Sequence, residues 1–175
     1  MQTDVLPWLD YQWAFTAPVG MYRAICERLR GTPARIEELL GDLPEDSDLR
    51  PAPDRWSICE HAGHLAMAEG LWQKRIREFL AGAERLTAAD MRNTATEESH
   101  FNQQPLEELL DDFRRARSGT MAMLDPLTLD HAARAAHHPR LGVSMRLVDL
   151  CTFMAEHDDH HLATVRALQR SETGG

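Results

Sequence analysis

The stretch "MAEHDDHHLATVRAL", residues 154–168, places three histidines and two aspartates within five positions of a predicted amphipathic helix. His157 and His161 are four residues apart, so on a helix they stand one turn apart on the same face. Both fall on the apolar seam, which points them into a core. Two imidazoles at this spacing can bind one metal ion, and imidazole suits zinc, nickel, copper and ferrous iron. The seam consists of Leu147, Leu150, Met154, His157, His161, Thr164 and Leu168.

A third ligand would have to come from another helix, and "EHAGHLAMAE", residues 60–69, supplies two candidates. Helical periodicity places His61 inside the apolar arc of that helix and His64 near its edge. Periodicity therefore slightly favours His61, although an edge position between two helices also suits a ligand. His160 is expected on the flank of its helix, exposed or supporting a ligand. The alternative hypothesis is that these histidines are hydrogen-bonded core residues without a metal.

The rest of the chain predicts an all-α protein with four long helices. "SICE", residues 57–60, is a capping-box signature that marks the start of the second helix. Thr32-Pro33 interrupts the first helix, which is expected to be kinked or to form two pieces. No segment alternates with period two, so no strands are expected. The predicted helices span residues 19–40, 57–81, 105–124 and 144–169, with loops at 42–56, 83–103 and 125–143.

Four helices with long connections predict a four-helix bundle with crossover connections rather than a simple up-and-down order. A chain of 175 residues is most simply a single domain. We expect an N-terminal arm at residues 1–18, the bundle domain at residues 19–171 and a flexible tail at residues 172–175. The arm carries Trp8 and Trp13, and these side chains need a surface to pack on. A homodimer is one way to provide that surface.

Composition excludes several classes of protein. The net charge is −9 and the basic residues are scattered, whereas nucleic-acid binding needs a concentrated positive surface. No apolar run approaches the roughly 18 residues of a membrane span. Residues 1–20 contain no basic residue, which argues against a secretory signal, so a cytoplasmic location is expected. The three cysteines are isolated and are expected to be buried, without disulfides.

Taken together, these segments resemble the DinB/YfiT superfamily of metal-dependent four-helix-bundle proteins. The similarity includes "TPARIEELL" from residue 32, "RPAPDRWSICEHAGHLAMAEGLWQKRI" from residue 50, "FRRAR" from residue 113 and "HPRLGVSMRLVDLCTFMAEHDDHHLATVRAL" from residue 138. The resemblance implies that His64, His157 and His161 are the metal ligands, in place of the His61 that periodicity favours. It implies a divalent ion (zinc, nickel or iron) with a coordination position left for water or substrate.

Family members with known activity include transferases that use bacillithiol or related low-molecular-weight thiols, and a mycothiol-dependent isomerase; members also tend to pair as dimers. The resemblance thus implies a small-molecule transferase acting with such a thiol, or a metal-dependent hydrolase. A non-catalytic metal-binding stress-response protein is the alternative. One departure is Thr164, where many relatives have a glutamine. A different substrate would follow if that glutamine shapes the pocket.

Other polar residues have simpler interpretations. Glu60 is expected to serve the capping box rather than to act as a base. Glu69 and Arg75 are expected to form pairs on the surface or between helices. His137 and His138 lie in a predicted loop, where histidines are usually solvated, although they could line the mouth of a pocket.

Overall fold

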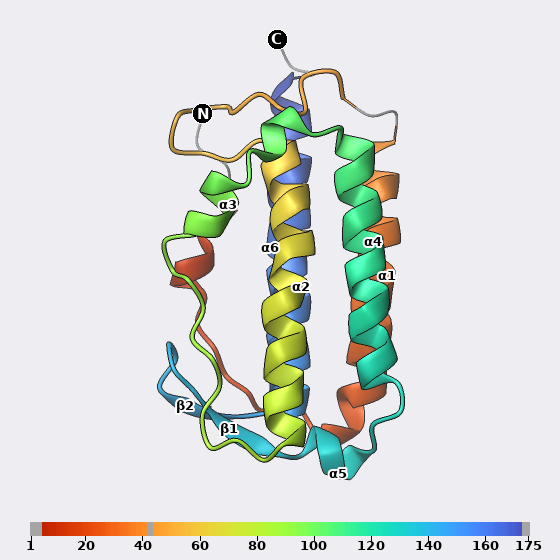
Figure 1. Cartoon of the computed structure of the whole chain (residues 1–175), viewed down its shortest axis with the longest axis vertical. Helices are drawn as coiled ribbons and strands as arrows, with labels where there is room; N and C mark the ends of the chain where they lie inside the picture. The colour runs from red at the N-terminus through yellow and green to blue at the C-terminus, as the bar shows by residue number, and fades with distance from the viewer. Residues whose placement is uncertain (1–4, 42–43, 173–175) are drawn as a thin grey trace.

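Four long helices form the body of the protein in the computed structural model, which describes residues 5–41 and 44–172. Figure 1 shows that α1 and α6 run in one direction and that α2 and α4 run in the opposite direction. The connection between α2 and α4 therefore travels the length of the bundle, as the predicted crossover requires. The four-helix bundle is confirmed; its helices are α1 (Tyr22–Leu40), α2 (Ile58–Leu80), α4 (Leu106–Leu124) and α6 (Leu147–Glu172).

Short elements occupy the connections and cover one side of the bundle (Figure 1). The expectation that no strands occur was wrong, because β1 and β2 form an antiparallel hairpin in which Ala135 pairs with Arg146 and His138 with Val143. Four-residue strands are too short for alternation to stand out in a sequence, and Gly142 provides the positive φ of 68° between them. The short elements are η1 (Trp8–Asp10), η2 (Val19–Met21), α3 (Thr94–Glu98), η3 (Phe101–Gln103), α5 (Leu129–Ala132), β1 (Ala135–His138) and β2 (Val143–Arg146).

Local signals explain how two of the long helices are shaped. At the start of α2, the Glu60 amide donates to Ser57 Oγ and the Ser57 amide donates to the Glu60 carboxylate, which confirms the capping box. The first helix does not divide at Pro33. Proline removes the hydrogen bond that the Leu29 carbonyl would accept, and Arg117 Nη1 of α4 donates to that carbonyl instead, at 2.7 Å. A neighbouring helix thus satisfies the group that Pro33 leaves free.

A buried polar layer crosses the bundle between two apolar clusters. Arg117 donates to Glu69 at 2.6 Å and to Asp158 at 2.7 Å, and all three side chains are at most 2 % exposed. Glu69 of α2 therefore pairs between helices, with Arg117 of α4 and not with Arg75. Arg75 donates instead to the carbonyl of Thr87, because the crossover segment passes along its side of α2.

The N-terminal arm packs on the body of its own chain. Trp8, Trp13 and Phe15 lie against the apolar cluster at the hairpin end of the bundle. The tryptophans of the arm therefore do not require a second subunit to pack against. The homodimer stays a prediction. Residues 1–4 of the arm and residues 173–175 of the expected tail lie outside the described residues, whereas Glu172 belongs to α6.

Two further expectations concern the described part of the chain. Cys26, Cys59 and Cys151 are buried and free, as the sequence predicts. No helix in residues 5–41 or 44–172 is long and apolar enough to cross a membrane.

Two glycines of α2 give a paired test of its packing. A Cβ at Gly63 would overlap the ring of Phe101, whereas a Cβ at Gly70 meets nothing within 4 Å. Gly63→Ala is expected to lower the free energy of unfolding by about 1–3 kcal/mol through overpacking. Gly70→Ala is expected to raise it by about 0.5–1 kcal/mol through helix propensity. Urea unfolding of both variants measures the difference, and equal effects would contradict the close approach of Phe101 to α2.

Candidate metal centre

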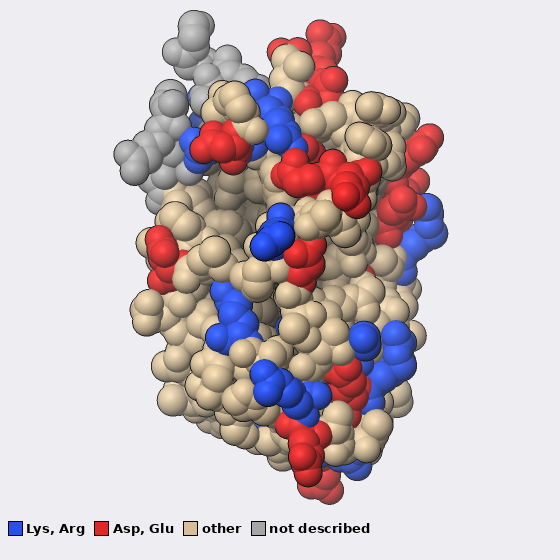
Figure 2. Space-filling model, turned by 60° about the vertical axis from the view of Figure 1, so that its left-hand side comes forward, with Lys and Arg blue, Asp and Glu red and all other residues tan. Residues whose placement is uncertain are grey.

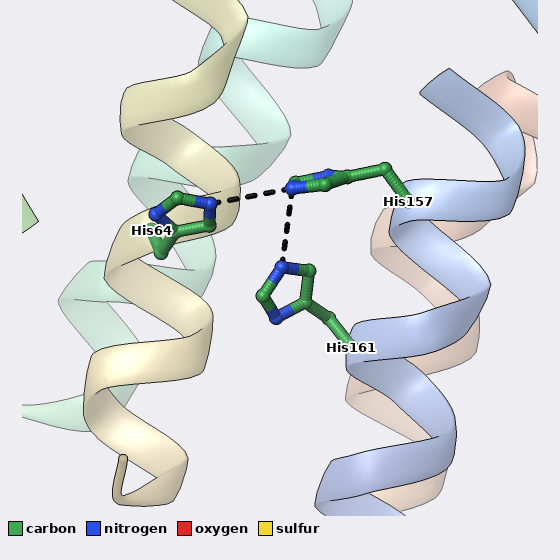
Figure 3. A group of neighbouring side chains, drawn as sticks. All are labelled: His64, His157 and His161. Carbon is green, nitrogen blue, oxygen red and sulfur yellow. Dashed lines mark hydrogen bonds between the residues drawn. The ribbon is translucent and has the colours of Figure 1, made fainter. Parts of the chain in front are cut away.

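Three histidines from two facing helices meet on one side of the bundle (Figure 3). His64 comes from α2, and His157 and His161 come from successive turns of α6. His157 Nε2 lies 3.3 Å from His64 Nε2 and 3.2 Å from His161 Nε2. One ligand atom from each ring lies within 4.8 Å of the other two. The structure thus brings together the three residues that the family resemblance singled out.

His61 is adjacent to this group without belonging to it. Its Nδ1 atom lies 2.8 Å from Nδ1 of His161, on the side of the His161 ring opposite to the Nε2 atom that faces His157. His61 is therefore placed to orient His161 rather than to act as a fourth ligand. Periodicity favoured His61 because it measures burial, and His61 is indeed the more buried of the two candidates on α2.

On each of the three rings, Nε2 faces the other ligands and Nδ1 faces away from them. The surroundings of the Nδ1 atoms are compatible with a cation between the Nε2 atoms. Nδ1 of His64 lies 2.9 Å from Oγ1 of Thr96, and Nδ1 of His161 faces His61. Nδ1 of His157 is buried and has no hydrogen-bond partner among the described residues. If Nδ1 carries the proton on each ring, three Nε2 lone pairs face one another. Those lone pairs repel one another unless a cation lies between them, so the donor set suits a divalent metal.

Burial keeps these histidines neutral, as metal ligands must be. Burial lowers the pKa of His64 to about 4. Burial, followed by the nearby imidazoles and Arg55, lowers the pKa of His61 to about 3. For His157 and His161, burial again dominates and holds the pKa well below its usual value. At neutral pH the rings therefore present lone pairs rather than charges.

These depressed pKa values predict acid sensitivity of the metal-free protein. The unfolded chain takes up protons near pH 6.5, whereas folded His64 stays neutral until about pH 4 and folded His61 until about pH 3. Stability should therefore be full above about pH 6.5 and fall as pH drops toward 4, by up to about 1.4 kcal/mol per pH unit for each buried histidine. Chelator-treated protein would be unfolded in urea at several pH values.

The matched variants for this measurement are His61→Gln and His100→Gln. His61→Gln removes one buried histidine and should flatten the decline between pH 6.5 and 4. His100 is exposed, so His100→Gln should keep the wild-type slope. Identical slopes in all three proteins would show that the buried histidines do not control acid stability.

A cavity of about 850 Å³ opens beside the three histidines. Figure 2 shows this face of the molecule, which is hollowed, with Lys and Arg side chains beside and below the hollow. His160 lines the cavity from the flank of α6, as expected, and Thr164 lines it one turn further on. His138 also lines it and is only 1 % exposed, so the expectation of a solvated loop histidine was wrong. The hairpin turns it inward.

Several cavity residues come from segments outside the four long helices. Trp8 of the arm contacts the ring of His157 at 5.3 Å between centroids, and Trp56 contacts the ring of His64 at 4.8 Å. Thr96 reaches His64 from α3, within the crossover that was expected to be irregular. No periodicity marks these positions, because the helices carry the regular pattern and the covering segments do not.

The fold and this histidine group define a class: a four-helix bundle with a potential metal centre built from two facing helices. A sequence model of the DinB superfamily matches residues 28–165, and the chain belongs to this family.

The fold has a counterpart among solved structures. YfiT from Bacillus subtilis, described as a probable metal-dependent hydrolase with an unusual four-helix bundle topology, aligns with a TM-score of 0.81 at 17 % sequence identity. The alignment covers 94 % of this chain and 95 % of the YfiT chain. No curated protein sequence matches significantly. The likeness to YfiT supports the fold.

Proposed function

We propose that this protein is a divalent-metal-dependent enzyme in which His64, His157 and His161 hold zinc, nickel or iron beside a small-molecule pocket. The substrate would enter the cavity, and the nucleophile would be a low-molecular-weight thiol in a transferase or water in a hydrolase. The observation that carries the proposal is the convergence of three neutral imidazole nitrogens on one point, at the wall of a cavity large enough for a small organic molecule.

The protein's own residues would prepare the reaction. When bound, a divalent ion supplies Lewis-acid chemistry that generates a nucleophile from a thiol or from water near neutral pH. Thr96 and His61 fix the rings of His64 and His161 through their outer nitrogens. Trp8 and Trp72 pack on the ring of His157 and keep water from that side. Three protein ligands leave room for a further ligand, as catalytic zinc sites do.

Hydrolysis and thiol transfer are each supported by a different comparison. YfiT, which shares the fold, is described as a probable metal-dependent hydrolase. Thiol transfer is the activity implied by the family resemblance. The cavity wall beside the histidines includes Trp8, Trp56 and Trp72, and this aromatic surface does not select between the two nucleophiles.

Turnover assays on metal-loaded protein test the proposal. Conjugation of low-molecular-weight thiols to monochlorobimane would report transfer, and cleavage of a p-nitrophenyl ester without thiol would report hydrolysis. Activity should depend on added zinc, nickel or iron, disappear with a chelator, and fall to background in His161→Ala. The exposed His100 provides the control variant His100→Ala, which should keep full activity. Bound metal without turnover of either kind would instead identify a non-catalytic metal-binding protein.

A further inference from the structure

A second polar group lines the same cavity and takes no part in the metal centre. Arg75 of α2 is 1 % exposed and donates twice to the Thr87 carbonyl, at 3.0 and 2.8 Å. Its Nη1 atom lies 3.2 Å from Nε2 of His138. Burial, followed by repulsion from the two guanidinium groups of Arg75 and Arg140, lowers the pKa of His138 to about 4. Both partners of Arg75 are thus neutral at pH 7.

Arg140 stands beside this group with an unsatisfied donor. Its Nη2 atom is buried and has no hydrogen-bond partner in the part of the chain that is described. Its guanidinium carbon lies 5.7 Å from the centre of the Phe153 ring. Neither Arg75 nor Arg140 forms an ion pair with a carboxylate of residues 5–41 or 44–172. Arg75 is buried and Arg140 is half-buried, and holding two guanidinium charges away from water without an anion is costly, so the arrangement favours an anionic ligand.

The pKa shifts of the two arginines also indicate positive charge without a compensating anion. Burial lowers the pKa of Arg75 to about 10; Glu78 opposes this shift, and the positive charge of Arg140 adds to it. Burial also lowers the pKa of Arg140. Glu78 does not neutralise the pair by contact, because its carboxylate accepts from the amide and hydroxyl of Thr87. Two like charges therefore share one wall of the cavity.

Trp72 connects this wall to the metal centre. The centroid of the Trp72 ring lies 5.5 Å from the centroid of the His157 ring. The guanidinium carbon of Arg75 also lies 5.5 Å from the centroid of the Trp72 ring. The indole Nε1 of Trp72 is a second buried donor without a partner among the described residues. A ligand that contacts both the arginines and the histidines therefore needs a body about as long as one aromatic side chain.

We infer that the substrate of this pocket is a small organic acid whose anionic oxygen group binds at Arg140, Arg75 and Trp72 while its reactive end lies at the three histidines. This inference rests on the proposed function and adds a substrate class to it. A carboxylate or a phosphate accepts the planar fork of donors that a guanidinium offers. A neutral or cationic ligand would leave the unpaired arginine charges uncompensated.

The acidic residues around the cavity do not offset this preference. Glu97 is engaged by Arg50 and by the indole of Trp56. Asp90 accepts from the backbone amides of Arg92 and Thr94. The other acidic residues of the lining, Asp10 and Asp54, are exposed, where water screens their charge. The four acidic residues of the lining therefore leave the charges of Arg75 and Arg140 uncompensated.

Binding to chelator-treated full-length protein tests the inference without the metal or turnover. The probes are 3-phenylpropionate, 2-phenylethyl phosphate and the neutral 3-phenylpropanol, which have similar apolar bodies. Calorimetry, supported by the fluorescence of the pocket tryptophans, gives each Kd. One of the two acids should bind at least about tenfold more tightly than the alcohol, as expected for charge-assisted hydrogen bonds. The preferred acid identifies the source of the anionic group as a carboxylate or a phosphate.

Variants localise the effect. Arg140→Gln should abolish the preference for the acid, and Trp72→Phe should weaken it while keeping the ring. Arg115→Gln, an arginine whose side chain is 71 % exposed on α4, should behave as wild type. Equal binding of acid and alcohol, no saturable binding of either acid, or a preference that survives Arg140→Gln would overturn the inference. Because the protein is metal-free throughout, the binding result does not depend on whether the three histidines hold a metal. Equally, a failure to bind these acids would leave the test of the metal centre unaffected.

Discussion

Replacing His157 with alanine is expected to reduce the bound metal from about one ion per chain to none. His157 Nε2 faces both of the other Nε2 atoms, at 3.2 and 3.3 Å, so its removal breaks both contacts of the group. The two remaining histidines, on different helices, would form a weak site. The measurement is plasma mass spectrometry of protein purified without a histidine tag, loaded with zinc, nickel or iron and then desalted.

The neighbouring His160 supplies the control for this experiment. His160 lies on the same helix and lines the same cavity, but the group of converging nitrogens does not include it. His160→Ala should therefore retain the metal. If wild type takes up no metal, or if the His157 and His160 variants lose it equally, the assignment of the three ligands is wrong.

The second large effect is expected from the buried cation of the polar layer. Arg117→Met should lower the free energy of unfolding by about 3–5 kcal/mol, enough to unfold a marginal domain. Arg117 donates to Asp158, Glu69 and the Leu29 carbonyl, and the substitution would remove all of these hydrogen bonds together. Burial raises the pKa of Glu69 although Arg117 opposes the shift, so without Arg117 this carboxyl would be protonated more readily still.

Arg115→Met is the matched control, because Arg115 lies two residues earlier on α4 and pairs with the exposed Asp112. An exposed pair contributes little, so the loss should stay within about 0.5 kcal/mol. Circular dichroism during urea unfolding gives both values. Similar losses in the two variants would mean that the polar layer does not hold the bundle together.

The polar layer also links stability to the candidate site. Asp158 follows His157 directly on α6 and accepts from Arg117 on α4 and from Thr32 on α1, at 2.7 and 2.8 Å. These contacts fix the rotation of α6 about its axis, and this rotation decides where His157 and His161 point. Through these contacts, Asp158 sets the direction in which both histidines point.

Helical periodicity was sufficient to predict the four long helices and the shared face of His157 and His161, and the motif "SICE" was sufficient to predict the capping box of Ser57. Each of these features depends on residues within a few positions of one another, because backbone hydrogen bonds and the 3.6-residue repeat act locally. The hairpin that carries His138 escaped prediction, since four-residue strands leave too little pattern to detect.

Only the tertiary structure decided which groups meet the histidines. Sequence spacing could not place His64, rather than His61, opposite His157, because that choice depends on how α2 rotates against α6. It also could not bring Trp8 from the arm, Thr96 from the crossover and Arg140 from the hairpin to one cavity. These contacts join residues far apart in the chain, and long-range packing, not local propensity, fixes them. The sequence by itself determined the helices and the histidine pair; packing determined the pocket.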